Sequence, residues 1–131
     1  MIAADTNVFV RVLLLDDVNQ AKIAEDFLSK TTQKGGLFVS SFTILELAWV
    51  LKSQGKSKEE IVTALEKIVN AQGVKISART VILAALARFR VAPNSVGLAD
   101  CLILSDALEN GAKLATFDEN LRKFDSRCIF P

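Results

Sequence analysis

The sequence predicts an α/β protein with a parallel sheet covered by helices on both faces. Short apolar runs that are typical of strands alternate with longer stretches in which apolar residues recur at helical spacing. Strands alternating with helices in this way indicate a parallel sheet. The chain has 131 residues, of which 50% are hydrophobic, and we therefore expect one domain over residues 1–131 with a substantial core.

The first part of the chain predicts three strands separated by helices. Strands are expected at residues 2–4, 37–39 and 74–76, and helices at about 6–14, 18–30, 42–52 and from Ser57 to Gly73. Ser40 offers an N-cap for the very apolar helix 42–52. Ser57 and Glu60 occupy the reciprocal positions of a capping box. The helix that they open carries the clearest amphipathic stripe, formed by Ile61, Ala64, Leu65, Ile68 and Val69.

The second part predicts two longer helices, two short strands and a final short helix. Helices are expected from a cap at Ser77 to about Phe89, at about 98–110, and after Asp118. Gly111 is the expected C-terminal stop of the second one. The strands are expected at 113–115 and, at a sheet edge, 127–130.

Charge and composition exclude several classes of function. With 16 basic and 15 acidic residues the formal charge is +1, so any nucleic-acid binding must come from a local patch. The absence of histidine excludes Ser-His-Asp and Cys-His catalysis and argues against zinc. Cys101 and Cys128 lie among apolar residues and are expected to be buried thiols. No apolar run reaches the roughly 18 residues of a membrane span, and the start lacks a signal-peptide pattern, so we expect a cytoplasmic protein.

Four carboxylates stand out from the solvated acids: Asp5, Glu46, Asp100 and Asp118. Asp5 and Asp118 are placed to cap the helices that follow them, and Asp100 lies in a first helical turn, where the macrodipole favours an acid. Asp5, Asp118 and Ser40 also come just after predicted strands, at the edge where parallel sheets bind ligands. Capping and a functional role both remain open for these residues.

Glu46 lies in a helix that is apolar enough to be expected mostly buried. Its neighbours one turn away include no base, so no local ion pair holds the charge. Asp100 likewise has no Lys or Arg within local reach. A buried unpaired carboxylate costs several kcal/mol, so Glu46 requires either a cation, such as an Arg from elsewhere in the fold, or a place on a narrow exposed strip.

A hard divalent cation would stabilise the four acids together. Mg²⁺ and Mn²⁺ favour carboxylate oxygens and water, and Mg²⁺ usually leaves positions for substrate phosphates. A carboxylate-bound metal without a histidine base points to phosphoryl chemistry.

The chain resembles the PIN-domain ribonucleases, and among them the VapC toxins of VapBC toxin–antitoxin pairs. The resemblance runs through the whole length in four motifs: Asp5-Thr6-Asn7, Leu45-Glu46-Leu47 in the helix that carries Trp49, Gly97-Leu98-Ala99-Asp100, and Leu114-Ala115-Thr116-Phe117-Asp118. It implies a three-layer α/β/α sandwich around a mainly parallel sheet. It also implies Mg²⁺- or Mn²⁺-dependent endonucleolytic cleavage of RNA that leaves a 3′-hydroxyl and a 5′-phosphate.

The resemblance also implies roles for individual residues. Asp5, Asp100 and Asp118 would ligate the metal, and Glu46 would complete the acidic quartet and orient the attacking water. Candidates that would fix the carboxylate rotamers are Thr6, Asn7, Ser40 and Thr116. Many members of the family carry a further acid near the position of Gly97, so the number of metal ions stays open. The basic residues nearest to the motifs, and thus candidates for RNA contact, are Arg11, Arg88 and Arg90.

The family further implies a homodimer and a cognate antitoxin whose segment covers the site. The apolar helix 42–51 is a candidate for part of such a surface, with plain core packing as the alternative. Two other readings stay open: a PIN nuclease of RNA maturation or decay, which the small single-domain size disfavours, and a PIN-like module that binds RNA or protein without cutting. A receiver-type phosphoacceptor is disfavoured because Asp16-Asp17 lies beyond the first strand and no Lys follows residues 114–116.

Overall fold

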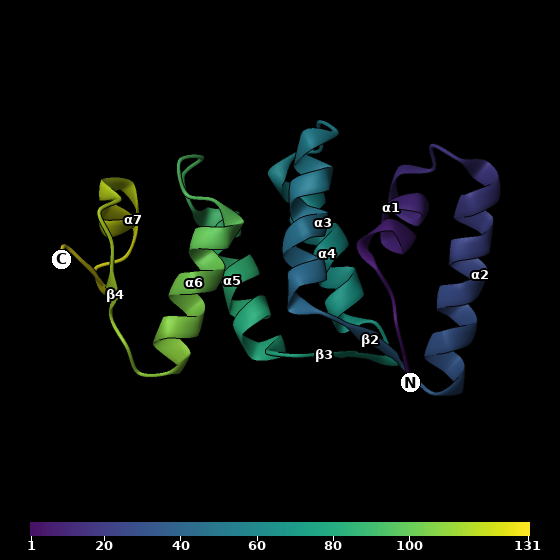
Figure 1. Cartoon of the computed structure of the whole chain (residues 1–131). Helices are drawn as coiled ribbons and strands as arrows, with labels where there is room; N and C mark the ends of the chain where they lie inside the picture. The colour runs from purple at the N-terminus through teal and green to yellow at the C-terminus, as the bar shows by residue number, and fades with distance from the viewer. The chain divides into compact units, whose positions relative to one another are not determined.

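A computed structural model describes all residues, 1–131, as two compact units that are treated in turn (Figure 1). Unit 1 comprises Met1–Ser77 and unit 2 comprises Ala78–Pro131. A single domain over residues 1–131 stays a prediction.

Unit 1 is built on a three-stranded parallel sheet of order β1-β2-β3. Its elements are β1 (Ile2–Ala3), α1 (Thr6–Leu14), α2 (Val18–Lys34), β2 (Leu37–Val39), α3 (Ser41–Ser53), α4 (Lys58–Asn70) and β3 (Val74–Ile76). Helix α1 packs against α2 and α3, and α3 also packs against α4 (Figure 1). Val39, Ile44 and Leu65 are fully buried at the centre of this unit, because central strands and inward helix faces present their apolar side chains to one another.

The helix boundaries in unit 1 follow local signals in the sequence. Ser40 caps α3 by accepting a hydrogen bond from the Phe42 N–H. Ser57 and Glu60 form the predicted capping box of α4, which satisfies two otherwise orphaned N–H groups. The Ser57 N–H holds the pKa of the Glu60 carboxyl below its usual value. Helix α2 continues to Lys34, beyond the predicted end at residue 30, until Gly35 and Gly36 stop it.

Unit 2 combines a helix pair with a two-stranded parallel sheet. Its elements are α5 (Arg79–Val91), α6 (Leu98–Glu109), β4 (Leu114–Ala115), α7 (Glu119–Phe124) and β5 (Cys128–Ile129). Helices α5 and α6 pack against each other and bury Ile82, Leu86 and Leu104. The β4–β5 register pairs Leu114 with Cys128 and Ala115 with Ile129.

The predicted cap at Ser77 is wrong. Helix α5 begins after Ala78, which adopts a left-handed conformation with φ of 54°. No side-chain hydrogen bond caps this helix. A left-handed alanine before the helix cannot be predicted from a serine at the expected spacing. The α/β class, the parallel pairing and the burial of both cysteine thiols are confirmed.

The longest helix, α2, has 17 residues. None of the helices combines the length and the hydropathy that crossing a bilayer requires.

Candidate functional site

Thr6 connects two of the predicted acids in unit 1. Asp5 follows β1 and caps α1, where its Oδ1 accepts a hydrogen bond of 2.7 Å from the Thr6 N–H. The buried Thr6 hydroxyl donates to Glu46 Oε2 at 3.1 Å. Asp5, the cap of α1, and Glu46 in α3 are therefore both hydrogen-bonded to the same threonine.

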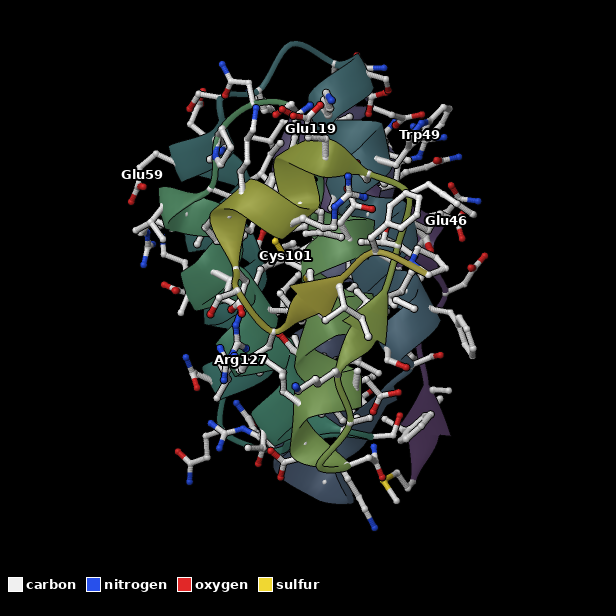
Figure 2. The ribbon with its side chains drawn as sticks, turned by 90° about the vertical axis from the view of Figure 1, so that its left-hand side faces the viewer. Glu46, Trp49, Glu59, Cys101, Glu119 and Arg127 are labelled. Atoms are coloured by element: carbon white, nitrogen blue, oxygen red, sulfur yellow. The ribbon has the colours of Figure 1, made fainter.

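Glu46 is exposed, so the expectation that the apolar helix buries this carboxylate is wrong. Phe42 and Trp49, one turn away on either side, are 81% and 70% exposed. Figure 2 shows Glu46 and Trp49 projecting from the same part of α3. The buried face of α3 consists of other residues, among them Ile44, Leu47 and Leu51. Of the two alternatives for Glu46, a partner cation or a place on a narrow exposed strip of the helix, the structure therefore shows the exposed strip.

Asp100 is half-buried at the start of α6 in unit 2. Its Oδ2 accepts a hydrogen bond of 3.0 Å from the Gly97 N–H. Asp100 is therefore the N3 residue of a capping box, whose side chain accepts from the N–H of the N-cap residue. The helix macrodipole also favours a negative charge at this position. A Cβ atom added at Gly97 would lie 3.7 Å from Asp100 Oδ2, in ordinary contact. A methyl group could therefore be accommodated at this position without a clash.

Asp118 follows β4 and caps α7. Its Oδ1 accepts hydrogen bonds from the N–H groups of Asn120 and Leu121, at 2.8 and 3.2 Å. The Asp118 N–H in turn donates to Thr116 Oγ1 at 3.0 Å. The loop is also held by Arg122, whose Nη1 donates to the Thr116 carbonyl at 2.7 Å. Arg122 is not among the residues predicted from the sequence, since neither periodicity nor a motif marks it.

Each of the four acids uses only one carboxylate oxygen for structure. Asp5 Oδ1, Glu46 Oε2, Asp100 Oδ2 and Asp118 Oδ1 accept the hydrogen bonds described above, and the second oxygen of each accepts none within its own unit. None of the four forms an ion pair with a Lys or Arg of its own unit. Capping and ligand binding are thus compatible, because the cap occupies one oxygen and leaves the other for a cation.

Neither unit taken by itself gathers three or more acidic, cysteine or histidine side chains in a group that could hold a metal ion. Asp5 and Glu46 lie in unit 1, and Asp100 and Asp118 lie in unit 2. All donors are hard carboxylate oxygens, which is the donor chemistry that suits Mg²⁺ or Mn²⁺.

The remaining predicted residues have varied surroundings. The Ser40 hydroxyl accepts the hydrogen bond that caps α3. Arg11 Nη1 pairs with both carboxylate oxygens of Asp16 at 3.1 Å, and Arg88 Nη1 donates to Ser105 Oγ at 2.8 Å between α5 and α6. Arg90 is exposed near the end of α5. Contact of these three arginines with RNA stays a prediction.

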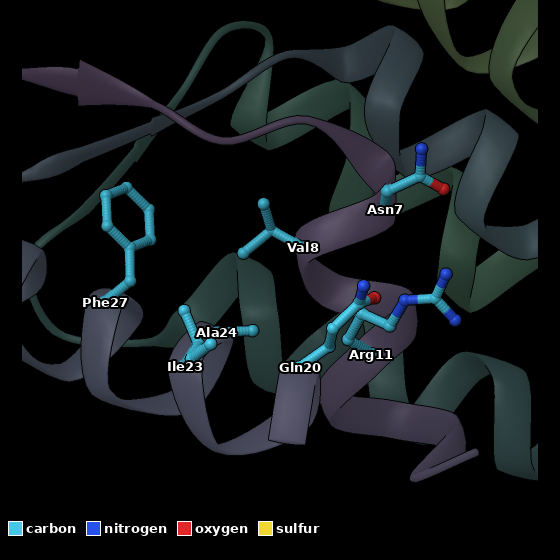
Figure 3. A pocket seen from close by; sticks show the side chains of 7 residues that line it. All are labelled: Asn7, Val8, Arg11, Gln20, Ile23, Ala24 and Phe27. Atoms are coloured by element: carbon cyan, nitrogen blue, oxygen red, sulfur yellow. The ribbon is translucent and has the colours of Figure 1, made fainter. Parts of the chain in front are cut away.

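An open cavity of about 460 Å³ lies between α1 and α2 in unit 1 (Figure 3). One of its lining residues, Asn7, lies two positions after Asp5 in the sequence. The lining has a polar and an apolar part. The polar part is formed by Asn7, Arg11 and Gln20, and the apolar part by Val8, Ile23, Ala24 and Phe27.

An ion pair supports the turn between α7 and β5. Arg127 Nη2 lies 2.8 Å from Asp125 Oδ2, and Arg127 Nε also donates to Oδ1. The hydrogen bonds from the Arg127 side chain lower the pKa of Asp125 to about 2. Burial raises the pKa of the neighbouring Cys128 thiol, which keeps it protonated and unreactive.

Asp5 and Asp118 each follow a parallel strand, β1 and β4, and each offers a carboxylate oxygen, the donor type that hard metal ions prefer. The family model of the PIN domain matches residues 2–126, and the chain belongs to this family. Its seven helices and parallel strands are compatible with the three-layer α/β/α PIN fold. PIN domains are generally nucleases that typically use divalent metal ions. A comparison with curated proteins finds no match.

Proposed function

We propose that the protein is a Mg²⁺- or Mn²⁺-dependent endoribonuclease in which Asp5, Glu46, Asp100 and Asp118 act together. The observation that carries the proposal is that each of these motif acids is held by a hydrogen bond through one oxygen while the other oxygen stays uncommitted. An open second oxygen is ordinary for a capping acid, as Asp17 at the start of α2 also shows, and what distinguishes these four acids is their place in the sequence motifs of a chain that belongs to the PIN family. Four such acids in a chain of a nuclease family are best explained by a shared ligand.

The proposed roles of the four acids are those that the family resemblance implies, and the local contacts support the roles of Thr6 and Thr116. Asp5, Asp100 and Asp118 would hold the metal ion, which when bound supplies an activated water and shields the phosphate charge from the acids. Glu46 would orient the attacking water and accept its proton. Thr6 would fix the Glu46 carboxylate, since its hydroxyl already donates to Oε2. Thr116 would fix Asp118 through the Asp118 N–H.

Cleavage of a single-stranded RNA by the purified protein tests the proposal. We expect cleavage with Mg²⁺ or Mn²⁺, none after chelation, and 5′-phosphate ends on the products. Asp100→Asn should abolish cleavage and weaken Mn²⁺ binding. Asp106→Asn, which alters an exposed acid on the same helix, should do neither. Metal-independent cleavage, or unchanged Mn²⁺ binding by Asp100→Asn, would contradict the proposal.

We also propose that the enzyme acts in the cytoplasm as the toxin of a toxin–antitoxin pair and forms a homodimer. The sequence motifs shared with VapC toxins support this role, and the exposed Phe42 and Trp49 beside Glu46 offer an apolar surface for a protein partner. Expression of the wild-type chain should arrest growth, and Asp5→Asn should relieve the arrest. A chain that cleaves RNA without affecting growth would instead indicate RNA maturation or decay, and a chain that binds RNA without cutting would indicate a binding module.

A further inference from the structure

Two exposed aromatic rings stand together in unit 2, directly after its paired strands. Phe117 and Phe130 follow β4 and β5 with one residue between the strand end and Phe117, and none between Ile129 and Phe130. Because the strands are parallel, with the Thr116 N–H donating to the Ile129 carbonyl at 2.9 Å, both rings emerge at the same edge. Their centroids are 5.6 Å apart and their planes meet edge to face at 85°.

These rings remain in contact with solvent. Phe117 is 76% exposed and Phe130 is 67% exposed. Exposed apolar groups that lie together, unlike scattered single ones, are typical of binding surfaces. Much of both side chains is therefore accessible to a ligand.

Arg122 adds a cation to the pair. Its guanidinium carbon lies 5.2 Å from the centroid of the Phe130 ring, within the range of a cation–π contact. The neighbouring bases are neutralised, because Lys123 pairs with Glu119 at 3.0 Å and Arg127 pairs with Asp125. Arg122 forms no such pair, so its charge is available to a phosphate or a base. We call Phe117, Phe130 and Arg122 the aromatic platform.

The aromatic platform is tied to the candidate carboxylate Asp118. Phe117 precedes Asp118, and the Thr116 hydroxyl accepts from the Asp118 N–H. The Thr116 carbonyl is held by Arg122. Phe117, Arg122 and Asp118 thus belong to one hydrogen-bonded loop, and the bond from the Thr116 N–H to the Ile129 carbonyl ties this loop to Phe130, which gives the platform a defined position relative to Asp118.

We propose that the aromatic platform stacks a base of single-stranded RNA next to the phosphodiester that is cleaved at the Asp118 carboxylate. This inference rests on the proposed nuclease function and names the form of its substrate. Exposed rings beside an unpaired guanidinium match a nucleotide, because the rings stack on the base and the cation attracts the phosphate. A paired duplex cannot present a base face in this way, so the platform selects unpaired segments.

Binding and cleavage measured separately test the inference. Binding is measured in EDTA with a short single-stranded RNA that carries 2-aminopurine, whose fluorescence is quenched when the base stacks. Phe117→Leu and Phe130→Leu keep apolar bulk but remove the ring. We expect each to weaken binding about tenfold and to reduce the quench. Phe117→Tyr and Phe130→Tyr should rescue both signals. Val91→Ala, which changes an exposed apolar residue at the end of α5, serves as the control and should bind as the wild type does.

The two proposals fail in different ways. If the wild type binds through the rings but does not cut RNA with Mg²⁺ or Mn²⁺, the platform stands and the nuclease function fails. If the wild type cuts and both Leu variants bind and cut equally well, the platform is overturned and the nuclease function stands. Leu variants that bind RNA normally but change the oligomeric state in light scattering would assign the rings to a protein interface and also overturn the platform.

Discussion

The Thr6 hydroxyl donates a hydrogen bond of 3.1 Å to Glu46 Oε2, although the two residues are 40 positions apart. Thr6→Val keeps the shape of this buried side chain and removes the donor. We expect Mn²⁺ affinity or cleavage to fall about tenfold or more, since a freed Glu46 loses its fixed orientation. Calorimetric Mn²⁺ titration and single-turnover cleavage measure the change. Thr6→Ser keeps the hydroxyl and should restore activity, whereas equal loss in both variants would show that packing alone matters.

Asp118 combines a structural with a proposed catalytic role, and two substitutions separate them. Asp118→Asn keeps an oxygen for the Asn120 and Leu121 N–H groups, so we expect the free energy of unfolding to change by less than about 0.5 kcal/mol. Asp118→Ala removes the cap and should cost about 1 kcal/mol. Both should lower cleavage about a hundredfold or more, because both remove the carboxylate charge. Retained cleavage by Asp118→Asn would confine this residue to capping.

Gly73 occupies a position that no other residue can take without strain. Its φ is +80°, and an added Cβ would collide with the backbone carbonyl of Thr32. Gly73→Ala should lower the free energy of unfolding by roughly 2–4 kcal/mol, from backbone strain and the steric clash together. Gly55 is the matched control, because its φ is +82° and nothing lies within 4 Å of an added Cβ. Gly55→Ala should cost only about 1 kcal/mol, and equal costs in urea unfolding would rule out the clash.

Asp125 should make stability depend on pH in the acid range. Hydrogen bonds from Arg127 lower its pKa from 3.8 to about 2. The carboxylate therefore stabilises the folded state fully above pH 3.8, and this contribution is lost as the pH falls toward 2. Asp125→Asn should reduce the free energy of unfolding by roughly 1–2 kcal/mol at pH 7, with the difference from wild type shrinking between pH 4 and pH 2.

Urea unfolding of both proteins across this pH range checks the prediction. A difference between Asp125→Asn and wild type that stays constant down to pH 2 would mean that the ion pair is not its source.

Local signals in the sequence located most helix and strand positions. The Ser57–Glu60 capping box opens α4 as predicted, because both partners lie within one turn and no other part of the chain is needed. The helix predicted at 6–14 and the strand predicted at 37–39 agree with α1 and β2. The left-handed φ of Ala78 could not be predicted from such local signals, because an alanine rarely adopts this conformation and no residue pattern marks it.

The exposure of Glu46 shows why composition alone misleads. An apolar helix is expected to be buried, but the buried face of α3 leaves Phe42 and Trp49 in solvent together with Glu46. Which side of a helix meets the core is decided by the elements that pack against it, and these lie far away in the sequence.

By itself the sequence determined the α/β class and most helix and strand positions, and it offered Asp5 and Asp118 as caps, because these depend on residue type, periodicity and hydrogen bonds within a turn. Only the tertiary structure decided that Thr6 meets Glu46 and that Phe117 stands beside Phe130. Both contacts join segments separated along the chain, and strand register and helix packing bring them together. Such contacts leave no local pattern that a reading of the chain could detect.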